Sequence, residues 1–276
     1  MPISKAERSK LHSHTFSEDK IDEFGGTHIV TPDISVADTL KHSLALFGSK
    51  PSALFLNIPS SIILALYVFV MFGSNSLTNL LWYTAAFFVL GILVAAPLSA
   101  VAKSRFYNTK ITSIIDPMLM SLNYLEPLVP IAYIGLMALA VQNSAVINLL
   151  STIVFGVLLL VILTIAVILH ISNLNSELSV YILYDKKLKR NAALGRSWMF
   201  ISGQSLKMLA INIIAYLPLV IAVLLDAAFS KTSIILYLTL LTFILADFCA
   251  SWWQACTSYI YEKIVKEAKP MKYSRL

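Results

Sequence analysis

Charged residues are scarce in this chain of 276 residues: Asp, Glu, Lys and Arg make up 13% of it, against about 25% in a typical soluble protein. Hydrophobic residues make up 58% and the mean hydropathy is +0.77, which excludes a water-soluble fold. The 2 cysteines cannot build a disulfide framework, and the scattered 9 glycines and 10 prolines exclude collagen-like and low-complexity chains. The composition therefore predicts an integral membrane protein.

The common catalytic motifs are also missing. The sequence has no Ser-centred elbow, His-Glu-x-x-His, Cys-x-x-Cys or glycine-rich phosphate loop. Cys249 and Cys256 lie about 10.5 Å apart along one predicted helix, too far for a disulfide. His12 and His14 have no third metal ligand nearby. We therefore expect no cofactor, no metal site and no enzymatic activity.

Hydropathy divides the chain into two tails and a membrane domain over residues 35–265. Residues 1–34 carry charges of both signs and no apolar run, which predicts a disordered cytoplasmic tail and not a signal peptide. Residues 266–276 form a short basic tail. A bilayer core needs about 20 apolar residues per helix. Six stretches approach that length, so we expect an all-α bundle of six spans: 52–73, 79–101, 125–142, 146–170, 207–229 and 234–253.

Lys and Arg indicate the orientation of these spans, because both are retained on the cytoplasmic side. With both termini in the cytoplasm, only Lys231 of the 21 Lys and Arg residues falls on the outer side. The segment after the fourth span holds a basic run near the membrane, which also favours contact with anionic lipid headgroups and not with nucleic acid. The lipid-contacting candidates are Lys186, Lys187, Lys189, Arg190, Arg196 and Lys207. We expect a multi-pass protein of the cell inner membrane.

An internal repeat relates the two ends of the membrane domain. Residues about 36–111 (repeat A) and about 190–265 (repeat B) share the order interfacial helix, span, short turn, span, and they flank a hairpin at about 125–170. The residues that match, with one slip in register, are Leu40 with Leu194, Ser43 with Ser197, Asn57 with Asn212, Ser104 with Ser258 and Tyr107 with Tyr261. The order of parts predicts a parallel repeat about an axis along the membrane normal.

The segments before the first and fifth spans are expected to form amphipathic helices at the membrane surface. The first has the pattern Leu-x-x-Ser-x-x-x-Phe over residues 40–47. The second reads Ala-Leu-Gly-Arg-Ser-Trp, ending at Trp198, and Ile-Ser-Gly-Gln-Ser-Leu-Lys, ending at Lys207.

Together with Tyr-Ile-Tyr at residues 259–261, these motifs resemble a six-helix prokaryotic membrane superfamily. That superfamily includes the membrane domain attached to some glycerophosphodiester phosphodiesterases and uncharacterised stand-alone inner-membrane proteins. The resemblance covers about residues 35–265. It implies a six-helix membrane module that lacks the phosphodiesterase barrel, with no catalytic residues to transfer.

Polar residues inside predicted spans are candidates for a functional site, because they are costly in lipid. Asp247, Ser251 and Gln254 share one face of the sixth span, and Asn57 and Asn212 lie at a similar depth, about 10 Å from the cytoplasmic edge. This layer either binds a headgroup, a cation or a proton, or, as we favour, forms hydrogen bonds between helices. His170 is expected to cap the end of the fourth span.

Three functions fit these features. The first is a non-enzymatic protein that engages lipid through its two interfacial helices and the polar intramembrane layer. It acts in membrane organisation or as a scaffold, alone, as a homo-oligomer or with a membrane protein partner. The second is a small transporter whose site is the layer of Asp247, Asn57 and Asn212. The third, least favoured because of their different depths, is an intramembrane enzyme acting on lipid with Asp247 and His170 as acid and base.

Overall fold

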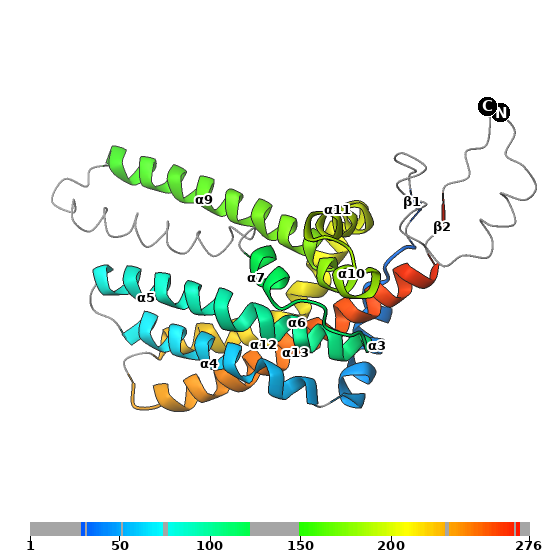
Figure 1. The fold of residues 1–276 in the computed structure, drawn as a ribbon. Coiled ribbons are helices and arrows are strands. Elements are labelled where there is room, and N and C mark those ends of the chain that lie inside the picture. The colour runs from blue at the N-terminus through cyan, green and yellow to red at the C-terminus, as the bar shows by residue number, and fades with distance from the viewer. Residues whose placement is uncertain are drawn as a thin grey trace, which may run out of the picture.

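The computed structural model describes residues 29–30, 32–50, 52–73, 77–121, 149–229, 232–267 and 269–270. This part of the chain is helical apart from strands β1 (Ile29–Val30) and β2 (Lys269–Pro270), which pair antiparallel. Figure 1 shows the arrangement, and the all-α prediction is confirmed. The helices are α3 (Val36–Ser49), α4 (Ser52–Gly73), α5 (Leu77–Leu90), η1 (Gly91–Ala95), α6 (Ala96–Tyr107), α7 (Ile115–Ser121), α9 (Leu149–Ser176), α10 (Ser179–Lys186), α11 (Arg190–Ile201), η3 (Ser202–Gln204), α12 (Ser205–Ala228) and α13 (Ile235–Glu267).

Four helical stretches among the described residues are long and apolar enough to cross a membrane, namely Trp82–Tyr107, Leu160–Lys186, Ser205–Asp226 and Ile235–Ile264. They contain or overlap the predicted second, fourth, fifth and sixth spans. Phe55–Met71 of α4, at the predicted first span, is a shorter apolar stretch. The predicted third span at 125–142 lies outside the described residues, as do most of both predicted tails. Six spans with both ends inside therefore stay a prediction.

Helix α13 is the centre of the packing. It has 33 residues, so it is about 50 Å long, against about 30 Å for a bilayer core. It packs against α12, α4, α3 and α6. The length of α13 lets one helix connect the apolar bundle to the more compact end of the molecule.

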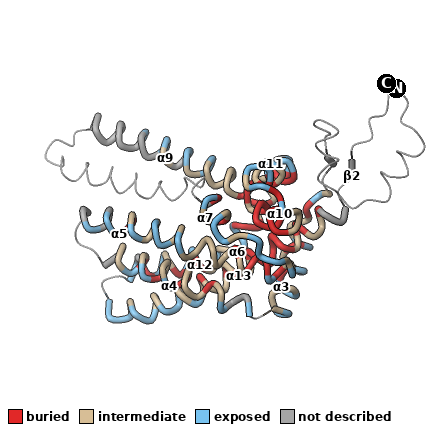
Figure 2. Tube along the Cα trace, viewed as in Figure 1, coloured by how far each residue is buried: buried red, intermediate tan, exposed pale blue. Residues whose placement is uncertain are grey.

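The best-buried side chains lie at that end, where α6, α10, α11 and the last turns of α13 meet (Figure 2). Elsewhere large apolar side chains lie exposed on the surface: Leu206 is 75% exposed, Trp82 73% and Tyr237 72%. Exposed apolar surface on this scale marks contact with a partner or a membrane. A surrounding bilayer explains why the long helices face outward with leucine, isoleucine and aromatic side chains.

The segment after the fourth span contains a helix that the sequence analysis missed. We expected a basic loop before Arg190, but α10 forms there with almost every side chain buried, including Tyr181 and Tyr184. The basic residues that follow, beginning at Lys186, hid this short apolar stretch. Lys187 ends α10 in the left-handed conformation with φ 54°, so the chain turns sharply into α11.

The second predicted span is interrupted by a π-helical segment, η1. Pro97 follows directly in the first turn of α6. Proline has no backbone N–H, and its ring crowds the carbonyl four residues earlier, which here belongs to Leu93 in η1. Widening the helix at this point relieves the crowding. Such π segments occur often at functional sites, and the fifth and sixth spans have no equivalent in the described residues.

The two predicted surface helices are α3 and α11, and both are docked on the bundle. Ser43 and Ser197, which the proposed repeat aligns, are each 0% exposed. Trp252 Nε1 donates to Ser43 Oγ at 2.9 Å and joins α3 to α13, whereas Ser197 Oγ donates to the Asn175 carbonyl at 2.6 Å and joins α11 to α9. The two helices dock on different neighbours, so the helix order fits the repeat while the repeat stays a prediction.

Candidate functional site

Three of the five predicted central residues lie together between α4 and α13. The Nδ2 atom of Asn57 donates to Ser251 Oγ at 2.7 Å and to Gln254 Oε1 at 3.0 Å. In return, Gln254 Nε2 donates to Asn57 Oδ1 at 2.9 Å and to Ser99 Oγ of α6 at 3.1 Å. Asn57 is 1% exposed and Gln254 3%. The sequence pattern found this group, apart from Ser99.

These amides have no donor capacity left for a ligand. A side-chain amide has two N–H donors, and both donors of Asn57 and both donors of Gln254 are used within the group. Their carbonyl oxygens each accept from the other amide. The arrangement therefore connects α4, α6 and α13 by hydrogen bonds, as the packing interpretation of this layer expected.

Asn212 lies elsewhere. Its Oδ1 atom is 3.1 Å from His170 Nε2, so the pair joins α12 to α9. The expectation that His170 caps a helix end is wrong, because α9 continues to Ser176. The predicted layer of Asp247, Asn57 and Asn212 therefore does not form one group, because Asn57 is bonded to α13 whereas Asn212 is paired with His170 of α9.

Asp247 is half-buried on α13, one turn before Ser251. Its Oδ1 atom is buried and has no hydrogen-bond partner. Ser61 of α4 is the side chain that approaches its carboxyl group, while the Ser61 hydroxyl itself donates to the Asn57 carbonyl at 3.0 Å. Asp247 is therefore next to the amide group of Asn57 and Gln254 but forms none of its hydrogen bonds.

A second carboxylate between the long helices was missed. Asp226, near the end of α12, is 0% exposed and accepts a hydrogen bond from Thr242 Oγ1 of α13 through Oδ2 at 2.5 Å. Its Oδ1 atom has no partner. The signal was present in the sequence: an acidic residue inside the predicted fifth span, at 207–229.

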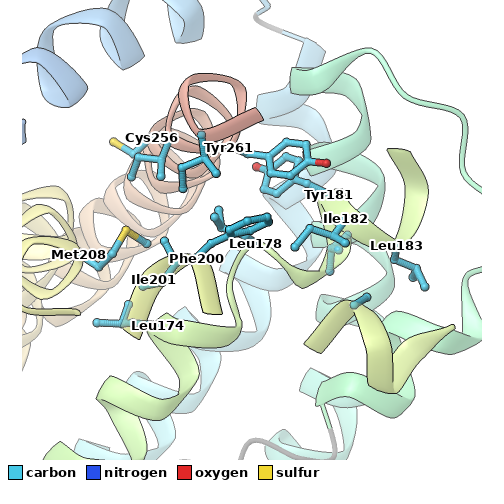
Figure 3. Close-up of a cluster of buried hydrophobic side chains, with 14 of the residues drawn as sticks. Leu174, Leu178, Tyr181, Ile182, Leu183, Phe200, Ile201, Met208, Cys256 and Tyr261 are labelled. Carbon is cyan, nitrogen blue, oxygen red and sulfur yellow. The ribbon is translucent and has the colours of Figure 1, made fainter. Parts of the chain in front are cut away.

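The compact end contains a group of tyrosines that sequence reasoning also missed. Tyr181 of α10 stacks on Tyr261 of α13 with ring centroids 5.4 Å apart, and Figure 3 shows both within the buried apolar cluster. The Tyr181 hydroxyl donates to the Gln254 carbonyl at 2.9 Å, and the Tyr261 hydroxyl donates to Asp185 Oδ2 at 2.8 Å. Tyr107, the repeat partner of Tyr261, touches it edge to face at 4.8 Å.

An ion pair supports this aromatic group. Lys103 of α6 is bonded to Glu177 at 2.5 Å, and the two side chains are 8% and 20% exposed. The Lys103 ammonium also lies 5.9 Å from the centre of the Tyr181 ring. In the sequence, Lys103 is one of the 20 Lys and Arg residues on the predicted cytoplasmic side. In the structure it fixes α6 to the chain between α9 and α10.

The six basic candidates for lipid contact differ in their surroundings. Lys187 and Lys189 are exposed in the turn between α10 and α11. Lys186 pairs with Asp185 at 3.2 Å, and Arg190 Nε donates to Asn191 Oδ1 at 3.4 Å. Arg196 is half-buried on α11. Lys187 and Lys189, in this turn, are thus the most exposed of the six candidates.

Lys207 is held by the segment before α3. It forms an ion pair with Asp33, and the Ile34 N–H donates to Gln204 Oε1 at 2.5 Å. Gln204 Nε2 donates in return to the Pro32 carbonyl at 2.8 Å. Residues 32–34, expected at the end of a disordered tail, are therefore packed at the start of α12, with Ile34 only 2% exposed.

Comparisons with family models, with curated proteins and with solved structures each return no match for this chain. The resemblance to the six-helix superfamily therefore stays a prediction from the motifs. Within the described residues no group of three or more His, Cys, Asp or Glu side chains could hold a metal ion.

Proposed function

We propose that this chain is a non-enzymatic inner-membrane protein with six spans and both termini in the cytoplasm, which engages anionic lipid headgroups and acts as a membrane scaffold. The observation that carries the proposal is the exposed surface of the α10–α11 turn and of helix α11. There the exposed cations Lys187 and Lys189 precede a helix with exposed apolar side chains, Trp198 at 41% and Met199 at 47%.

This combination suits the boundary between headgroups and acyl chains. Tryptophan and long apolar side chains favour that zone, and each lysine near the surface adds roughly 1 kcal/mol of attraction to an anionic leaflet. Leu206, at the start of α12, is also exposed, at 75%. Helix α11 is fixed to the bundle by buried Ser197 and Phe200, so the contact is made by a rigid element.

The polar centre supports a scaffold more than a transporter. A transport site needs groups that are free to bind cargo, whereas all four N–H donors of Asn57 and Gln254 are used within the group and with two serines. Hydrogen bonds of this kind fix how membrane helices pack. Two observations favour the transporter as a second candidate: the π segment η1 and the unpartnered Oδ1 atom of Asp247.

Lipid competition tests the proposal. The protein is placed in nanodiscs that contain equal amounts of phosphatidylglycerol and phosphatidylcholine, released into the gas phase, and its retained lipids are counted by native mass spectrometry. We expect phosphatidylglycerol to be enriched on the wild type. The double variant Lys187→Ala, Lys189→Ala should lower that enrichment roughly 30-fold, since two lysines contribute roughly 2 kcal/mol.

Lys41→Ala is the matched control, because Lys41 is also an exposed lysine but lies on α3, away from the α10–α11 turn. It should retain the wild-type enrichment. Equal enrichment on the wild type and the double variant would overturn the proposed contact site.

A further inference from the structure

The chain that follows α6 exposes apolar side chains on an element that is packed on the bundle. Ile115 is 67% exposed and Ile114 52%, and Ile111 and Leu119 are exposed as well. Leu119 lies one turn after Ile115 on α7, so these two side chains share one face of that helix. Met120, by contrast, is buried in the apolar cluster of the compact end. Helix α7 is therefore amphipathic, with one apolar face packed on the protein and another facing outward.

Hydrogen bonds fix the segment at both ends. At its start, Lys50 Nζ donates to the Arg105 carbonyl at 3.1 Å, and Asn108 ends α6 in the left-handed conformation with φ 58°. At its end, the Tyr184 hydroxyl of α10 donates to the Ser113 carbonyl at 2.7 Å. The Ser113 hydroxyl in turn accepts from a backbone N–H in the first turn of α7. The exposed isoleucines are thus presented by a fixed loop, which loses little conformational entropy on binding.

The segment also lies at a suitable level for the membrane surface. The apolar stretch Trp82–Tyr107 has 26 residues and is about 39 Å long, against about 30 Å for a bilayer core. It is therefore long enough for the end of α6 to reach the headgroups, from where the chain leads beside α10 to α7 (Figure 1).

The charges of the segment favour an anionic surface. Arg105 and Lys110 are exposed, and Asp116 is the one acidic residue between positions 105 and 121. Cations beside exposed apolar side chains are typical of protein elements that lie at the boundary between anionic headgroups and acyl chains. Asp116 follows Ile115 directly, so this carboxylate limits the depth to that boundary.

We propose that residues 108–119, the α6–α7 segment, insert into the surface of the cytoplasmic leaflet. Ile114, Ile115 and Leu119 contact the acyl chains there, and Arg105 and Lys110 contact the phosphates of anionic lipids. The inference rests on the membrane orientation in the proposed function. It concerns a second surface, separate from the turn between α10 and α11.

Spin labelling of the full chain in phosphatidylglycerol nanodiscs tests the insertion. A nitroxide attached to Ile115→Cys should be more accessible to oxygen, which concentrates in lipid, than to a water-soluble nickel complex. Ile114→Cys should show the same pattern, and it serves if Ile115→Cys does not fold. The native Cys249 and Cys256 are buried and contribute little label.

Lys41→Cys is the matched control, because Lys41 is exposed on α3, three residues after Asp38. Its label should be more accessible to the nickel complex than to oxygen. The nanodisc contains no other protein, so a label at Ile115 with the same aqueous pattern would overturn the proposal and leave a cytoplasmic protein as the occupant of this surface.

Two further variants separate this inference from the proposed function. In the double variant Lys187→Ala, Lys189→Ala the label at Ile115 should keep its lipid pattern, even where enrichment of anionic lipid is lost. Lys110→Glu reverses a charge near the isoleucines and should shift the label toward water in phosphatidylglycerol nanodiscs. An unchanged label in Lys110→Glu would overturn the contact of Lys110 with anionic headgroups.

Discussion

The side-chain amides of Asn57 and Gln254 bind each other in both directions, with N···O distances of 3.0 and 2.9 Å, across the contact between α4 and α13. Apolar surfaces give little driving force for association between helices in lipid, so polar contacts and close packing determine which helices meet. This amide pair sets the register of α4 on α13, and through Ser99 it also holds α6.

Removing one amide should destabilise the bundle. Asn57→Ala leaves the polar ends of Gln254 and Ser251 buried without their partner, and we expect a loss of about 1 to 2 kcal/mol in the free energy of unfolding. Unfolding in mixed micelles by increasing SDS measures this loss. The control Asn191→Ala changes an exposed asparagine on α11 and should leave the midpoint unaltered. Equal midpoints for both variants would contradict the role of the pair.

The ion pair of Lys103 and Glu177 should matter more than any surface charge. Both side chains are largely buried, and truncating one partner of such a pair leaves the other uncompensated, at a loss of about 3 kcal/mol. Lys103→Met should therefore lower the thermal midpoint of the detergent-solubilised protein clearly. Lys110→Met, at an exposed lysine beyond α6, should not. The double variant Lys103→Met, Glu177→Leu should recover part of the loss, and no recovery would argue against a direct pair.

Asp247 discriminates the scaffold from the transporter. If the protein is a scaffold, Asp247→Asn in proteoliposomes should leave proton permeability, followed with an internal pH dye, the same as in wild type. A wild-type proton leak that disappears in Asp247→Asn, with the fold retained by circular dichroism, would favour proton-coupled transport instead. Asn212→Ala is a useful companion, because Asn212 pairs with His170 and not with Asp247.

The proposed orientation predicts opposite labelling of two single-cysteine positions. Thr232 is exposed in the turn between α12 and α13, so Thr232→Cys should react in intact cells with a membrane-impermeant maleimide. Lys187→Cys should react only after the membrane is opened. The native Cys249 and Cys256 are each 0% exposed and give a low background. Labelling of both positions from outside would exclude the proposed topology.

Counting along helices found the group of Asn57, Ser251 and Gln254 because equal depth and a shared helix face follow from helix geometry alone. The same count also predicted Asn212 in that group, and this prediction is wrong. Depth does not tell which helix packs against which, and α12 turns Asn212 toward His170.

Other features were hidden for local reasons. Helix α10 is short and is followed by a basic run, so composition favoured a loop where Tyr181 builds the core. Asp226 stands near the end of an apolar stretch, where an acid resembles a boundary residue, and only the structure shows that Thr242 encloses it. The η1 segment follows from Pro97, yet a single proline in a span does not by itself predict a π segment.

The most direct test of lipid engagement compares two kinds of variant under identical conditions. Native mass spectrometry from mixed nanodiscs is applied to the wild type, to Asp247→Asn and to the double variant Lys187→Ala, Lys189→Ala. A lipid-contacting scaffold predicts that the wild type and Asp247→Asn retain the same anionic lipids, while the lysine variant loses them. Loss of a bound molecule from Asp247→Asn alone, with the lysine variant unchanged, would contradict the account and make the central carboxylate the binding site.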